Sequence, residues 1–473
     1  MNWSNYRFLA IPLLLIGGCK ALSPESRMGE AGAPGQWAAS KEAQAGIDRN
    51  WIGKIGGSEL RNLVDQAISE NQDLRAAAAR VEKASAEARI AGAGRRPSLA
   101  LGTDGSRSEQ NFIGYPIIGN SGAIPSIISE QYGVDLNAAW EVDIWGRMRA
   151  GEEAAIADAE ARSYDYEAAR VSLAGQVAKT WLALAESNEQ VALAKEGLQA
   201  RKVLANAVRE RFERAIADDG GSASQVRLTA AEVANGEGTL AQRQLERERT
   251  IRQLEILLGK YPSGSLQAGA KLPGFPGSTP SGLPSELLQR RPDILAAERA
   301  VASAGRRVKQ RKLARFPSLK LTGTGGTNTD SLRDVLNSDF SVWSIGGSLT
   351  QPIFQGGEIA GGIASEQAGE REQVAALRKT VLDAFGEVEQ ALVAEAYLAE
   401  RERAGKRAAD LSKEAADRAY EEFDAGTGSV LTLIEAKEQD INTASQYVAV
   451  KRLRLENRVD LHLALGGDFR TSK

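Results

Sequence analysis

The chain has very few residues with metal-binding or redox chemistry. It contains one cysteine and one histidine in 473 residues, so a metal site of the usual His/Cys type and a disulfide framework are both excluded. Aromatic residues make up only 5%, and 59 basic residues face 62 acidic ones, so no basic excess favours nucleic acid. The single histidine, His462, lies between two leucines, which favours a structural role. We therefore expect no cofactor and no enzymatic activity.

What is present at the start of the chain is a targeting pattern. Arg7 precedes an apolar run over residues 8–18, which is too short to cross a bilayer as a helix but is typical of a secretory signal. The only cysteine, Cys19, follows two glycines at the end of this run, as in the bacterial lipobox. We predict a signal peptide over 1–18 and an acylated Cys19, with Lys20 favouring transfer to the outer membrane. The alternative is that Cys19 is simply a small buried residue.

The sequence of the rest of the chain indicates an internal duplication. Residues 96–98 match 316–318, and residues 257–259 match 464–466, at offsets of roughly 207 to 220. Each copy predicts a helix, two β-strands and a long helical hairpin. The predicted segments are a lipid-anchored N-terminal tether (19–57), a first repeat (58–260), a Pro/Gly connector (261–284), a second repeat (285–466) and a C-terminal tail (467–473).

The clearest strand is predicted from Val134 to Ile144, where apolar residues alternate with mostly polar or acidic ones. Its length suits a tilted transmembrane β-strand with the apolar face toward lipid. A half-buried strand of a soluble sheet fits the alternation at least as well. Further candidate strands are marked by the apolar pairs Leu99 and Leu101, Leu319 and Leu321, and by the alternating Trp343, Ile345, Leu349 and Ile353.

Long helices follow both strand pairs. A helix is predicted from Ser58 to Ile90, and another from Gly151 to about Ala217, which would be about 100 Å long. Within the second helix the apolar residues keep a heptad spacing, which predicts side-by-side packing of helices. Those residues are Val177, Trp181, Leu184, Val191, Leu198, Ala205, Val208 and Phe212. Glycine turns at 218–221 and 424–428 would close the hairpins.

Four strands in one chain cannot close a membrane barrel, and lipid does not tolerate open strand edges. If these strands span a membrane, several copies must therefore pool them. Gly146 and the pair Gly356-Gly357 lie where each strand must bend into a helix.

Several motifs together resemble the TolC-type outer membrane efflux family. They are Leu287-Leu288-Gln289-Arg290-Arg291-Pro292-Asp293-Ile294 with Glu298, Trp145-Gly146-Arg147, and Pro352-Ile353-Phe354-Gln355-Gly356-Gly357. Cys19 suggests its lipoprotein (OprM/NodT-like) branch. The resemblance implies an α+β membrane protein, a homotrimer with a twelve-stranded β-barrel continued by an α-helical tunnel through the periplasm. It also implies a periplasmic adaptor and an inner membrane pump as partners.

The same resemblance marks candidate functional residues at the hairpin tips. Glu435 matches an acidic position that rings the family's periplasmic opening, and Thr432 stands where an aspartate is frequent. The first turn carries the extra acidic residues Asp218 and Asp219. A plain exposed carboxylate is the alternative for Glu435. The turn glycines Gly220, Gly221, Gly426 and Gly428 are the predicted adaptor contacts.

The family-signature residues Arg290, Arg291, Pro292 and Asp293 are interpreted as structural rather than as a binding cluster. Pro292 suits the first turn of a helix, and Asp293 suits its positive N-terminal end.

The function predicted from these observations is a passive outer membrane duct for small molecules such as drugs, dyes or metals. It would work in a tripartite efflux system, with a pump of the resistance-nodulation-division type. The alternatives are a duct for type I protein secretion and a non-conducting periplasmic coiled-coil scaffold lipoprotein.

Overall fold

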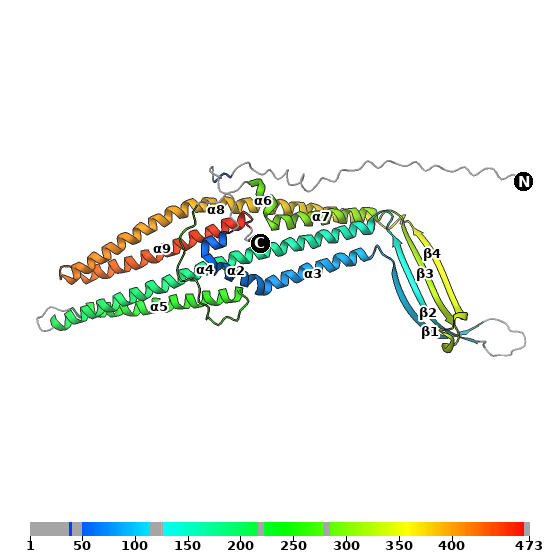
Figure 1. Ribbon diagram of the computed structural model, residues 1–473, viewed down its shortest axis with the longest axis horizontal. Helices are drawn as coiled ribbons and strands as arrows, with labels where there is room; N and C mark the ends of the chain where they lie inside the picture. The colour runs from blue at the N-terminus through cyan, green and yellow to red at the C-terminus, as the bar shows by residue number, and fades with distance from the viewer. Residues whose placement is uncertain are drawn as a thin grey trace, which may run out of the picture.

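The computed structural model describes residues 37–39, 50–113, 124, 126–215, 222–277 and 284–467. The signal peptide, Cys19 and the first hairpin turn with Asp218, Asp219, Gly220 and Gly221 lie outside these residues. The molecule is elongated, with long helices along its length and a small sheet at one end (Figure 1). None of the described helices combines the length and the apolar character needed to cross a membrane.

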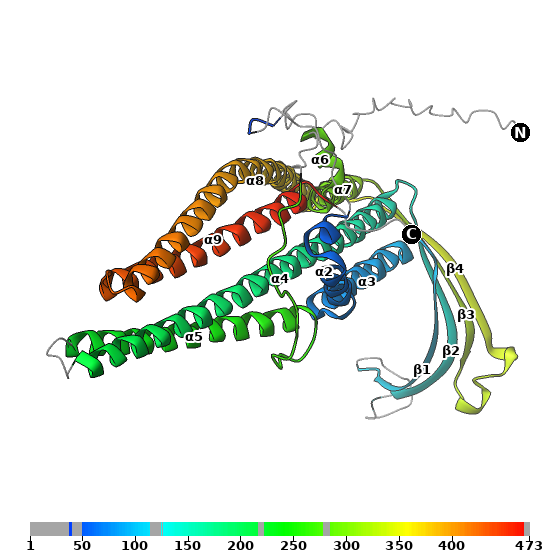
Figure 2. The same cartoon turned by 60° about the vertical axis from the view of Figure 1, so that its left-hand side comes forward.

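The order of elements repeats along the chain. The first copy contains α3 (Gln72–Ala93), β1 (Ser98–Asn111), β2 (Ser126–Val142), α4 (Arg147–Ala215) and α5 (Ala223–Leu257). The second contains α7 (Pro292–Leu313), β3 (Ser318–Thr329), β4 (Ser341–Thr350), α8 (Glu358–Asp424) and α9 (Val430–Ala464). The helix α2 (Trp51–Glu70) precedes the first copy and the short α6 (Pro284–Arg290) precedes the second; two single-turn 3-10 helices, Leu332–Asp334 and Ser338–Phe340, join β3 to β4. The two copies lie side by side (Figures 1 and 2).

The strands form one antiparallel sheet in the order β1-β2-β3-β4. Leu136 of β2 pairs with Leu101 on one side and Gly325 on the other, and Gly325 pairs with Trp343. Because paired residues lie on the same face of a sheet, the apolar positions of all four strands share one face. On the opposite face, Asn137 pairs with Thr324, which pairs with Ser344. The alternation predicted from the sequence is therefore continuous across the sheet.

The strand bounds differ from the prediction at the end of the sheet that joins the helices. The predicted strand 134–144 is part of a longer strand, β2, that ends at Val142. Asp143 leaves the strand because its carboxylate accepts hydrogen bonds from the backbone N–H groups of Met148 (3.0 Å) and Arg149 (2.8 Å), which begin α4. Ile353 likewise lies beyond β4, which ends at Thr350.

The prediction of one continuous helix from Ser58 to Ile90 was wrong. The structure has two helices, α2 and α3. α2 begins at Trp51 but is kinked at Gly57, which has φ +64° and directly precedes the predicted start at Ser58. Asn71 separates them, because its backbone is extended and its side-chain oxygen accepts a hydrogen bond from the N–H of Leu74. The amide of Asn71 also donates to the carbonyl oxygen of Leu257 at 3.0 Å, which fixes the break against the end of α5.

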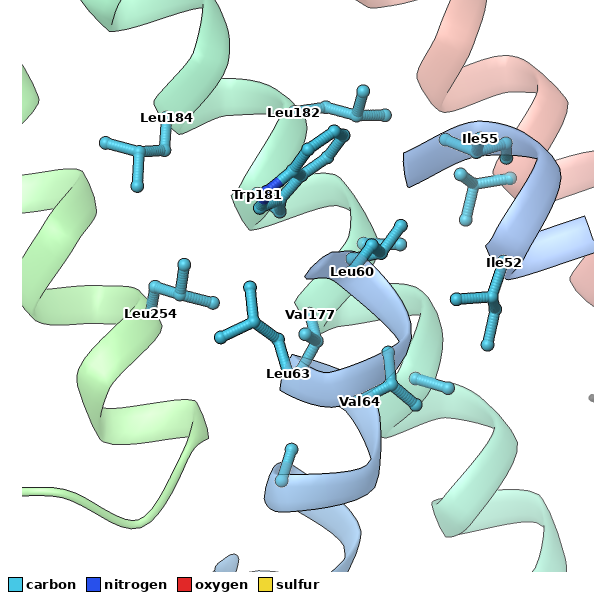
Figure 3. Packing of buried hydrophobic residues seen from close by; sticks show 14 of the residues in the cluster. Ile52, Ile55, Leu60, Leu63, Val64, Val177, Trp181, Leu182, Leu184 and Leu254 are labelled. Atoms are coloured by element: carbon cyan, nitrogen blue, oxygen red, sulfur yellow. The ribbon is translucent and has the colours of Figure 1, made fainter. Parts of the chain in front are cut away.

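The main core lies where α2 crosses the middle of α4. Figure 3 shows Leu60 and Leu63 of α2 facing Val177 and Trp181 of α4, with Leu254 of α5 beside them. The predicted heptad residues of α4 are mostly buried, including Val177 and Leu184. His462 is buried as expected and stacks on Trp51, with ring centroids 5.5 Å apart.

Candidate functional site: the hairpin tips and the strand ends

The tip of the second hairpin is a tight turn between α8 and α9. Gly426 has φ +79°, a conformation that costs a residue with a Cβ about 1–2 kcal/mol. Its N–H donates to the carbonyl oxygen of Phe423 at 3.0 Å, and the N–H of Gly428 donates to that of Glu422 at 2.9 Å. A Cβ on Gly428 would lie 2.9 Å from the backbone nitrogen of Phe423, so this position also requires glycine. Ser429 then caps α9 by accepting a hydrogen bond from the N–H of Leu431.

Two of the four predicted gating residues lie on the exposed face of α9. Thr432 and Glu435 are both exposed and three residues apart, so they share one face of the helix. Leu433, on the opposite face, is 1% exposed and packs in the core of the tip. Among the described residues Glu435 takes part in no salt bridge. A carboxylate in this position can repel or attract charge at the tip.

The two hairpins meet at the tip through residues that the sequence did not single out. Arg211 of α4 donates a hydrogen bond to the carbonyl oxygen of Phe423 at 2.6 Å. Its guanidinium carbon also lies 3.9 Å from the centroid of the Phe423 ring. Around this pair, Leu204 and Val208 of the first hairpin pack with Val430 and Leu433 of the second. The heptad pattern indicated Val208, but no sequence signal marked Arg211.

The family-signature residues hold the start of α7 against the other helices of the second copy. Arg291 is 8% exposed and forms two hydrogen bonds with the Asp293 carboxylate, at 3.0 and 2.6 Å. It also donates to Glu387 of α8 at 2.5 Å and to the carbonyl oxygen of Ala464 at the end of α9. Burial alone would lower the pKa of Arg291, but these carboxylates outweigh it and raise the pKa. Pro292 is the first residue of α7, and Arg290 is exposed.

The strand-to-helix junctions of the two copies touch each other. Trp145 donates its indole N–H to the carbonyl oxygen of Pro317 at 2.8 Å and stacks on Phe316 with centroids 5.0 Å apart. Gly146, Gly356 and Gly357 all have positive φ, as their predicted bends require. The apolar face of the sheet is exposed in the single chain, with Trp343 at 78% and Ile345 at 84%. In the described part of the chain, β1 and β4 each have one edge without a partner strand.

The sequence matches the family described as "Outer membrane efflux protein" over residues 63–260 and 283–467. The chain belongs to this family. It is 30% identical to the outer membrane protein OprJ of Pseudomonas aeruginosa, over 96% of this chain and 94% of OprJ. It is 27% identical to the toluene efflux pump outer membrane protein TtgF of Pseudomonas putida, over 98% of this chain and 97% of TtgF.

The fold is similar to the crystal structure of the Campylobacter jejuni CmeC outer membrane channel. The TM-score is 0.82 at 26% identity, over 93% of this chain and 92% of CmeC. The predicted fold class, one protomer of a trimeric barrel continued by a helical tunnel, is confirmed. As a member of the outer membrane efflux protein family, the chain is an outer membrane transport duct and not an enzyme. In the described part of the chain, no group of three or more His, Cys, Asp or Glu side chains could hold a metal ion.

Proposed function

We propose that this efflux protein is the passive exit duct of a tripartite system and works as a homotrimer. The observation that carries the proposal is the sheet, which has one apolar face and two edges without partner strands in the described part of the chain. Open edges are not tolerated in lipid, so three protomers would pool four strands each into twelve. The long helices α4 and α8 would then extend the duct into the periplasm.

The proposed partners are a periplasmic adaptor at the hairpin tips and an inner membrane pump of the resistance-nodulation-division type. Gly426 has no atom within 4 Å of the position that a Cβ would take, and Gly428 keeps the turn tight beside it, so an adaptor's helical ends could pack closely on the second tip. Gly220 and Gly221 would supply the same surface at the first tip. Small molecules are the proposed cargo, in line with the similarity to TtgF, a toluene efflux pump outer membrane protein.

A lipid anchor on Cys19 is part of the proposal. Residues 37–39 dock on α8, where the N–H groups of Ala38 and Ala39 donate to the Glu389 carboxylate at 2.7 and 2.9 Å. Trp37 is 2% exposed and packs edge-on against Phe385. The chain from Cys19 to Trp37 can extend to about 60 Å. This exceeds the length of α7, about 33 Å, which separates the docking region from the strands. An acylated Cys19 could therefore reach the membrane while Trp37 stays docked.

Glu435 is proposed to line the periplasmic opening. In a trimer, three copies would face one another near the threefold axis, attract cations and repel each other. Thr432 would lie beside each copy, and Asp218 and Asp219 would add negative charge at the neighbouring tips.

The test is conductance of the purified trimer in planar lipid bilayers. The wild-type protein is expected to form pores, and Glu435→Ala to raise their conductance, while Glu421→Ala on the exposed face of α8 should not. An unchanged Glu435→Ala trace would refute gating by this residue but not conduction. Absence of any pore would overturn the duct. Deleting the gene should sensitise cells to dyes, drugs or metals, and impaired export of a protein instead would change the cargo.

A further inference from the structure

A cavity of about 450 Å³ lies between the two hairpins, back from their tips. Side chains from α4, α5, α8 and α9 all line it, so its walls come from both copies of the duplicated chain. Its volume falls within the range of sites that hold small organic ligands, roughly 300–1,000 Å³. The location is distinct from the exposed face of α9 that carries Glu435.

Most of the cavity wall is apolar. Leu204 of α4 and Leu433 of α9 are buried in it, and Ile434 and Ile441 line it further along α9. Gly197 of α4 leaves no spare room for a side chain there, because a Cβ would lie 2.7 Å from Cδ1 of Ile441. Helix packing is therefore close around the cavity. A ligand filling it would gain most of its contact from hydrocarbon surface.

The polar groups of the cavity have an excess of negative charge. Arg201 of α4 lies 3.7 Å from a carboxylate oxygen of Glu232 in α5 and 3.7 Å from one of Glu438 in α9. The single positive charge of Arg201 is thus shared between two carboxylates. Burial raises the pKa of Glu438, and the hydrogen bond and negative charge of Glu232 raise it further, while Arg201 opposes the rise.

The other charged groups do not cancel this excess. Asp417 of α8 is paired with Lys437 of α9 at 3.3 Å, and Glu196 of α4 adds another carboxylate to the lining. Four carboxylates therefore face two cations around the cavity. Asp440, on the next turn of α9, is also acidic; burial raises its pKa, while Lys437 and Lys413 oppose the rise.

We propose that this cavity binds a small lipophilic organic cation. The hydrophobic part of the ligand would pack against Leu204, Ile434 and Ile441, and its positive charge would lie near Glu232 and Glu438 and relieve their repulsion. Tyr420, which also lines the cavity, offers an aromatic ring to the cation. A small inorganic cation fits less well, because no three acidic side chains among the described residues are grouped closely enough to hold a metal ion. Binding here does not depend on conduction and would bridge the first and second hairpins.

The probes are tetraphenylphosphonium and tetraphenylborate, which have the same shape and opposite charge. Calorimetric titration of the full-length trimer in nanodiscs, with empty nanodiscs subtracted, is expected to show saturable binding of the cation with one site per protomer. Glu438→Gln should weaken it about tenfold, through the loss of one nearby charge. Glu421→Gln, on the exposed face of α8, is the matched control and should leave the affinity unchanged.

Two further variants separate charge from shape. The pair Glu232→Gln with Glu438→Gln removes two of the four carboxylates and leaves Glu196 and Asp417 against Arg201 and Lys437. The preference for tetraphenylphosphonium over tetraphenylborate should therefore be lost. Val203→Trp, at a half-exposed wall position, should fill the space and abolish binding of both ions. Size-exclusion chromatography checks that each variant is a trimer. If the double variant does not assemble, the two single variants Val203→Trp and Glu438→Gln still test the proposed binding site. Two results would overturn the proposal: no saturable binding of tetraphenylphosphonium, or an affinity that neither Glu438→Gln nor Val203→Trp changes.

Discussion

Arg211 and Phe423 lie 212 positions apart in the sequence and join the tips of the two hairpins. The Arg211 guanidinium donates to the Phe423 carbonyl oxygen at 2.6 Å and covers the Phe423 ring. Because Phe423 precedes the turn that contains Gly426, this contact holds the second hairpin from the side of the first. Any movement of the second tip away from α4 must first break it.

We expect Arg211→Ala to loosen the turn of the second hairpin. The lost hydrogen bond and cation–π contact should lower the free energy of local opening by about 1–2 kcal/mol. Hydrogen exchange of the peptide covering 421–431 should therefore become about five- to thirtyfold faster. Arg214→Ala is the control, because Arg214 is exposed and its salt-bridge partner among the described residues is Glu210 of its own helix. Equal exchange in both variants would show that the contact does not hold the turn.

The connector between the copies is expected to release at low pH through Glu255. This residue is 2% exposed, and its carboxylate accepts backbone hydrogen bonds from Gly264 (2.7 Å), Ser265 (3.0 Å) and Leu266 (3.1 Å). Burial alone would raise the pKa of Glu255, but these hydrogen bonds outweigh it and lower the pKa. A lowered folded-state pKa means that the stabilisation is fully present above the ordinary glutamate value, about 4.3, and is lost as the pH falls through the lowered value.

Hydrogen exchange of residues 263–266, corrected for intrinsic pH dependence, measures this release. Protection should stay constant from neutral pH to about pH 5 and decline below about pH 4. Glu255→Gln should reduce protection at neutral pH and remove most of the pH dependence. Glu237→Gln, an exposed carboxylate of the same helix that pairs with Lys202 of α4, should behave as the wild type. A pH profile that survives in Glu255→Gln would assign the release to another group.

Trp145→Phe should weaken the junction between sheet and helices. The substitution keeps an aromatic ring against Phe316 but removes the hydrogen bond to the Pro317 carbonyl oxygen, at a cost of about 1 kcal/mol. Trp145→Ala removes both contacts and should cost more. The temperature at which the trimer dissociates in SDS should fall in that order. Trp343→Phe, on the apolar face of β4, is the matched control, and an equal shift there would indicate a general effect of losing an indole.

Some features of this protein were predictable because they depend on the local geometry of the chain. The strand at Val134 and the heptad spacing from Val177 onward are periodicities of 2 and 3.5 residues, which the backbone of each element imposes on its own sequence. Glycine at 146, 356 and 426 follows from backbone angles that other residues adopt only at a cost. The break at Asn71 was missed because the apolar stripe continues past it, and only the contact with Leu257 shows why the helix ends there.

The sequence by itself determined the duplication, the amphipathic strands and the long hairpins, since each corresponds to a repeat or a regular period in the amino-acid sequence. Only the tertiary structure decided which side chains meet between the hairpins. Arg211 with Phe423, and Arg201 with Glu232 and Glu438, come from separate helices, and each of those arginines resembles the many charged residues of an exposed helix face. Their partners are fixed by how the two copies pack against each other, which no local pattern records.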